Sequence, residues 1–82
     1  MVDRIHDLIT RFPEDERTAR ELIRKDRSFN ALCDEYAQIG KELHTLARLN
    51  DVAAAAQKDG LRRRRMVVEE ELVTLMEGYR SL

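Results

Sequence analysis

The chain has little of what small proteins use for covalent or metal cross-linking. Its 82 residues include one cysteine, Cys33, two histidines, His6 and His44, and no tryptophan. A single cysteine excludes a disulfide within the chain. Cys33 and His44 would lie about 16 Å apart along one helix, too far to share a metal ion. We therefore expect no metal. Three glycines and two histidines cannot supply a glycine-rich phosphate loop, a nucleophile elbow or a catalytic triad, so we also expect no cofactor and no catalytic residues.

Long apolar runs are also absent. The longest covers residues 52–56 (VAAAA), far short of the roughly 20 residues of a membrane-spanning helix. No basic stretch followed by an apolar one marks a signal peptide near Met1. The net charge of −1 gives no overall field toward nucleic acid or an acidic membrane. These features predict a cytoplasmic protein without membrane contact, which suits a single reduced cysteine.

Charged and helix-forming residues are abundant instead, since 38% of the chain is charged. One apolar series follows the spacings 3, 4, 3, 4, 3 of a helix packed along one seam. Its members are Phe29, Leu32, Tyr36, Ile39, Leu43 and Leu46. A second series near the end has the members Leu61, Val68, Leu72, Leu75, Tyr79 and Leu82. The two series predict long helices over 27–49 and 52–80, paired as an antiparallel hairpin.

Two shorter helical segments precede the hairpin. Apolar residues at helical spacing predict a first helix over residues 1–12: Val2, Ile5, Leu8, Ile9 and Phe12. Pro13 ends it and suits the first position of a second segment over 13–25. The polar face of the first helix balances Asp3 and Asp7 against Arg4 and Arg11, so it lacks the cationic bias of membrane-seeking helices. We expect it to cover the end of the hairpin or to dock on a partner.

The hairpin turn has two candidate positions. Asn50-Asp51 offers a turn and a cap for the alanine-rich stretch, whereas Lys58-Asp59-Gly60 offers a turn with glycine. We favour the first position, because alanine is the best helix former. Gly60 would then lie inside the second long helix, at a cost of about 1 kcal/mol relative to alanine.

Four consecutive arginines, Arg62, Arg63, Arg64 and Arg65, are the most suggestive functional feature. On a helix they fan out over about 300°, and no aromatic residue lies among them to stack on bases. Three acids, 69–71, follow and offset their charge. The run predicts a solvated or ion-paired helix surface, with phosphate binding to nucleic acid as the alternative. Arg65 also falls on the seam, so it must reach a carboxylate, lie at an open part of the seam or keep its head in water.

A homodimer is expected, because one hairpin hides only one stripe of each helix. Leu22, Ile23 and the flanks of the seam would otherwise leave a sizeable apolar patch. One hypothesis pairs two copies antiparallel about an axis near Val67. Arg65, Arg64 and Arg63 would then face three acids of the second copy: Glu69, Glu70 and Glu71.

Three stretches in order give the chain a resemblance to the YdcH-like family of small bacterial helical proteins. They are His6-Asp7-Leu8-Ile9 with Phe12-Pro13-Glu14; Phe29-x-x-Leu32-x-x-Glu35-Tyr36-x-x-Ile39-x-x-Glu42-Leu43; and Leu61-Arg62-Arg63-x-Arg65-Met66-x-Val68-x-Glu70-Glu71-Leu72. The chain departs from the family pattern at Glu69-Glu70, where the family has Lys-Asp, at Arg27 and in the alanine-rich stretch. The resemblance implies a helical hairpin and brings no catalytic residues and no agreed activity.

The sequence thus predicts one all-α domain over residues 1–82, an antiparallel hairpin with a short N-terminal helical segment that dimerises into a bundle. Its predicted function is a non-enzymatic protein-interaction, adaptor or self-assembly module with an unidentified partner. Nucleic-acid binding through Arg62 to Arg65 is the alternative. The expected contact residues come from both seams: Phe29, Leu32, Tyr36, Ile39, Leu43, Leu46, Val68, Leu72, Leu75 and Tyr79.

Overall fold

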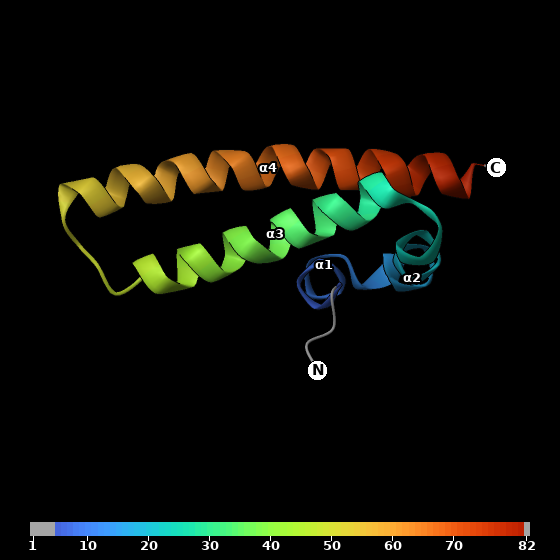
Figure 1. Ribbon diagram of the computed structural model, residues 1–82, viewed down its shortest axis with the longest axis horizontal. Helices are drawn as coiled ribbons and strands as arrows, with labels where there is room; N and C mark the ends of the chain where they lie inside the picture. The colour runs from blue at the N-terminus through green and yellow to red at the C-terminus, as the bar shows by residue number, and fades with distance from the viewer. Residues whose placement is uncertain (1–4, 82) are drawn as a thin grey trace.

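The computed structural model describes residues 5–81 as a set of helices without a strand. They are α1 (His6–Arg11), the 3-10 turn η1 (Pro13–Asp15), α2 (Glu16–Lys25), α3 (Arg27–Leu46) and α4 (Val52–Arg80). Helices α3 and α4 run antiparallel along each other, which confirms the predicted all-α hairpin (Figure 1). The patterned residues Val2, Asp3, Arg4 and Leu82 lie outside the described residues.

Side-chain caps set the start of both long helices. A carboxylate oxygen of Asp26 accepts a hydrogen bond of 3.0 Å from the Phe29 amide, and Asp51 accepts one of 2.7 Å from the Ala54 amide. The turn therefore lies at residues 47–51, at the favoured of the two predicted positions, and Gly60 lies inside α4. Helix α3 ends at Leu46, before the predicted residue 49, because the Leu49 amide bonds the Leu46 carbonyl and tightens the last turn.

Helices α1 and α2 cross the hairpin at one end, which we call the base (Figure 1). Helix α1 packs on α3, and α2 packs on both α3 and α4. Together they enclose one apolar core from all four helices and the residue before α1: Ile5, Leu8, Ala19, Leu22, Phe29, Cys33, Tyr36, Ile39, Val68, Leu72 and Met76. Leu22 is thus buried within a single chain, and the expectation that it would lie exposed in a monomer is wrong, because α2 folds back over the hairpin.

Polar contacts fasten the N-terminal helices to the C-terminal half of α4. Asp15 in η1 is buried, and its Oδ1 accepts a hydrogen bond of 2.6 Å from Nη1 of Arg80. Lys25 donates from Nζ to the Tyr79 hydroxyl at 3.1 Å, and Arg11 pairs with Glu69 at 3.2 Å. These contacts hold α1 and α2 in place over the core of the base.

The opposite end of the hairpin, which we call the tip, consists of the last turns of α3, the turn 47–51 and the first turns of α4. Helix α4 alone is about 44 Å long at 1.5 Å per residue, close to the 47 Å length of the molecule. It therefore extends well beyond α1 and α2 (Figure 1). Leu43, Leu46 and Leu61 are only half-buried there, and Val52 is exposed.

Candidate functional site

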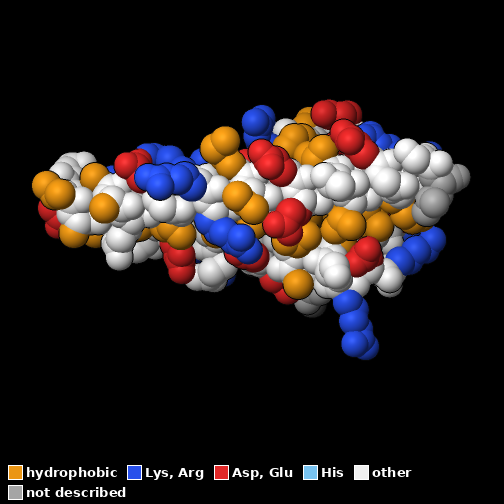
Figure 2. Space-filling model, turned by 90° about the horizontal axis from the view of Figure 1, so that it is seen from above, with side chains coloured by type: hydrophobic (Ala, Val, Ile, Leu, Met, Phe, Trp, Pro, Cys, Tyr) orange, Lys and Arg blue, Asp and Glu red, His pale blue; other side chains and the backbone are white. Residues whose placement is uncertain are grey.

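An outer ridge runs along the side of α4 that faces away from α3. We define it by Arg63, Met66, Val67, Glu70 and Thr74, whose spacings place them on one side of a helix. All five are exposed, with Met66 at 61% and Val67 at 43%. Figure 2 looks onto this side of α4 and shows apolar side chains at the surface between charged ones. Among the described residues, these five belong to the exposed side of α4.

Two open hollows flank the outer ridge and share Glu70 and Thr74 as their common wall. One lies toward α3 and is lined by Leu32, Val67 and Leu75, with Ser28 and Glu71. The other lies toward the end of α1 and is lined by Phe12, Met66 and Val73, with Arg11 and Glu69. Their volumes, about 540 and 490 Å³, fall in the range of small-molecule pockets, but such pockets enclose their ligand. Open hollows beside an apolar ridge suit the side chains of a protein partner better.

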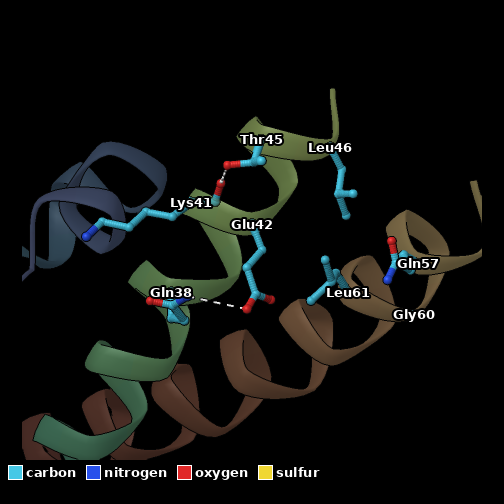
Figure 3. Close-up of a pocket in the computed structure, with 8 residues that line it drawn as sticks. All are labelled: Gln38, Lys41, Glu42, Thr45, Leu46, Gln57, Gly60 and Leu61. Carbon is cyan, nitrogen blue, oxygen red and sulfur yellow. Dashed lines mark hydrogen bonds between the residues drawn. The ribbon is translucent and has the colours of Figure 1, made fainter. Parts of the chain in front are cut away.

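A third groove lies at the tip, between α3 and α4 (Figure 3). Leu46 and Leu61 point into it from the two helices, and Gly60 leaves it open on the α4 side. Polar side chains line its remaining walls: Gln38, Lys41, Glu42, Thr45 and Gln57. Gln38 and Glu42 already bond each other at 3.3 Å, as Figure 3 shows. The groove carries apolar surface but no concentration of charge that would select a ligand.

The four arginines lie in four different settings. Arg64 forms a two-pronged ion pair with Glu35 across the hairpin, through Nε to Oε2 and through Nη2 to Oε1, the latter at 2.9 Å. Arg62 lies 3.6 Å from Asp59, one turn earlier on α4. Arg63 is exposed on the outer ridge and forms no ion pair with another described residue. The arginines therefore present no common face to a phosphate backbone.

Arg65 lies at an open part of the seam, which is one of the three predicted ways to accommodate it. It is half-buried and lines a small hollow with Lys58 and Arg62, beside Leu43 and Ala47 at the end of α3. Burial raises the pKa of the neighbouring Tyr36 to about 12, with the charge of Glu69 adding to it and that of Arg65 opposing it. The Arg65 charge thus acts on the phenol of Tyr36, a residue buried in the core of the base.

The Arg64–Glu35 pair shifts the pKa of both of its side chains. The hydrogen bond from the Arg64 guanidinium lowers the pKa of the Glu35 carboxyl below its usual range, and the same bond raises the pKa of Arg64. Because both side chains are more than a third exposed, solvent screens the pair and its net contribution to stability is small. Its structural consequence is larger, since it joins the middle of α3 to the middle of α4.

Most of the predicted contact residues serve the core of the chain itself. Phe29, Tyr36, Ile39, Val68 and Leu72 are buried, and the others are half-buried: Leu32, Leu43, Leu46, Leu75 and Tyr79. Leu32 and Leu75 reach the hollow beside the outer ridge, and Leu46 reaches the tip groove. The seam residues thus hold the hairpin together, and only their half-buried members also contribute to a surface.

Three residues that matter in the structure gave little signal in the sequence. Glu35 belongs to neither apolar series, yet it is half-buried in the pair with Arg64. Asp15 stands between two other acids, Glu14 and Glu16, yet it is buried. Met76 lies outside the seam series, although it is fully buried. The helical position of Met76, four residues after Leu72, was the available signal.

Within residues 5–81, no three side chains of the kinds that ligate metals gather into a possible metal site. His6 and His44 are exposed, and Cys33 is buried in the core of the base. None of the helices described has the length and apolar character needed to cross a membrane.

Comparison of the chain with models of protein families, with curated proteins and with solved structures found no match. The resemblance to the YdcH-like family therefore stays a prediction from the sequence.

Proposed function

We propose that this chain is a non-enzymatic protein-interaction module that binds its partner through the outer ridge of α4. One observation carries the proposal: Met66 and Val67 lie exposed side by side at the base, where the other large apolar side chains described are buried or half-buried. Apolar residues rimmed by charged ones are typical of protein-interaction sites. The two hollows beside the ridge add partly accessible apolar surface from α1 and α3.

In this fold, the residues that stabilise the chain are separate from those proposed to bind a partner. The base has its own buried core and its own polar fastenings, so the ridge is not needed to hold the chain together. A rigid helix that presents side chains at regular spacing is a common way to position contacts for another helix. The cytoplasmic location belongs to the same proposal and rests on the sequence alone.

A photo-crosslinking residue at position 67, with a matched one at the exposed Ala55 of α4, tests the proposal in cells. We expect a protein adduct of defined mass from position 67 and none from position 55. Met66→Asp in the same chain should abolish the adduct while leaving helicity, measured by circular dichroism, unchanged. An adduct with nucleic acid, or no adduct specific to position 67, would contradict the proposal and return attention to the arginine run.

A further inference from the structure

The outer ridge, taken as the protein-binding surface proposed above, carries side chains that fit one particular partner. We propose that a second copy of this chain docks on it, with the two α4 helices antiparallel and a two-fold axis passing between Met66 and Val67. Each copy would then offer the same ridge to the other, as in most symmetric dimers.

The charges of the ridge complement each other under this rotation. Arg63 and Glu70 lie at equal distances on either side of the point between Met66 and Val67. Reversing one copy therefore places Arg63 of each chain against Glu70 of the other, which gives two identical ion pairs. Both side chains are exposed, and neither forms an ion pair with another described residue of its own chain. Opposite charges that face each other in this way fix the register and orientation of paired helices.

The apolar residues of the ridge, Met66 and Val67, lie next to the proposed two-fold axis. Residues beside a two-fold axis meet their own counterparts, so Met66 would pack on Met66 and Val67 on Val67 of the second copy. Figure 2 shows this order along α4, with basic side chains toward the tip, apolar side chains in the middle and acidic side chains beyond them. An apolar centre between two reciprocal ion pairs is a self-complementary surface.

The structure also selects this register over the one centred on Val67 that the sequence suggested. That register uses Arg64 and Glu69, but Arg64 pairs with Glu35 and Glu69 pairs with Arg11 inside the chain. It also uses Arg65, which is half-buried on the inner side of α4. Moving the axis by half a residue leaves only exposed residues in the contact. The contact is narrow, so the dimer should be weak and dependent on concentration.

Sedimentation equilibrium on the full chain, at low and moderate salt, tests the inference. The wild type should dimerise, with weaker association at higher salt because the ion pairs are screened. Arg63→Glu and Glu70→Arg should each lower the association constant about tenfold or more, since each places like charges in both contacts. The double variant R63E/E70R should recover most of the wild-type association constant, because it restores opposite charges in both contacts. Arg48→Glu reverses the charge of an exposed residue in the turn and should leave the association constant unchanged.

Circular dichroism should show equal helicity for all of these variants, because the Arg63 and Glu70 side chains are exposed and form no ion pair with another described residue of their own chain. A wild type that stays monomeric at every concentration would overturn the pairing, as would single variants that associate normally or a double variant without recovery. A monomer that still crosslinks another protein from position 67 would overturn the pairing alone. A chain that binds neither itself nor another protein there would overturn the proposed function as well.

Discussion

The base and the tip of the hairpin are built from the same two helices but reach different degrees of burial. At the base, α1 and α2 cover the hairpin, and Phe29, Val68, Leu72 and Met76 are completely buried. At the tip, two helices face each other alone, and Leu46 and Leu61 remain half-buried beside an open groove. Two helices can hide only the stripe between them, so a third and a fourth helix are needed to close a core.

The two regions therefore depend on different sources of stability. The base relies on apolar burial and on long-range contacts such as Asp15 with Arg80. The tip relies on local terms: the Asp51 cap, the alanines at residues 53–56 and the bond from Lys58 Nζ to the Leu49 carbonyl at 2.8 Å. Changes to the core should thus be felt most at the base, and changes to helix propensity most at the tip.

The largest expected effect compares one leucine from each region. Leu72→Ala at the base should lower the free energy of unfolding by about 3 kcal/mol, because it leaves a cavity in a closed core. Leu46→Ala at the tip should cost about 1 kcal/mol, because half of that side chain already contacts water. Urea unfolding followed by circular dichroism measures both. Equal losses would mean that the tip is covered in solution.

The next effect concerns the fastening between η1 and the end of α4. Arg80→Ala leaves the buried Asp15 carboxylate without its partner and should cost about 2 kcal/mol. Asp15→Ala leaves an arginine that can turn into water and should cost about half as much. The same unfolding measurement, made on both variants at neutral pH, distinguishes them. The reverse order would show that Arg80 acts through the packing of its stem.

Alkaline pH should weaken the base through Tyr36. Its pKa rises from 10.0 to about 12 on folding, so the unfolded chain loses this proton first. The stability that the raised pKa supplies is complete below pH 10 and is lost as the pH approaches 12, by up to about 1.4 kcal/mol per pH unit. Unfolding of the wild type and of Tyr36→Phe should therefore diverge in this window. Parallel pH profiles would place Tyr36 in contact with water.

The smallest expected effect compares two glycines. Gly60→Ala on α4 should stabilise the chain by up to about 1 kcal/mol through helix propensity, because an added Cβ meets no atom within 4 Å. Gly40→Ala in the base should gain less, because its Cβ would lie 3.4 Å from Oδ2 of Asp7. Thermal unfolding detects both shifts. A loss of stability in Gly60→Ala would place a contact on the α4 surface at that position.

Much of the fold could be predicted because its signals are local. The a/d spacing from Phe29 to Leu46 and the polar cap residue Asp51 act within a few residues of where they stand. They gave the two long helices and the favoured turn. The candidate site was predicted less well. The ridge residue Met66 belongs to no apolar series. Of the four arginines in the run, only Arg63 is exposed without an ion pair to another described residue.

What the sequence by itself determined is therefore the set of helices, the starts of the two long ones and most of the stripe that each turns inward. Helical periodicity and capping are properties of neighbouring residues. Only the tertiary structure decided where α1 and α2 lie, and with them which surface of α4 stays open. Glu35 and Arg64 are 29 residues apart, and Asp15 and Arg80 are 65 apart. No local pattern specifies such pairs, because they depend on how whole helices pack.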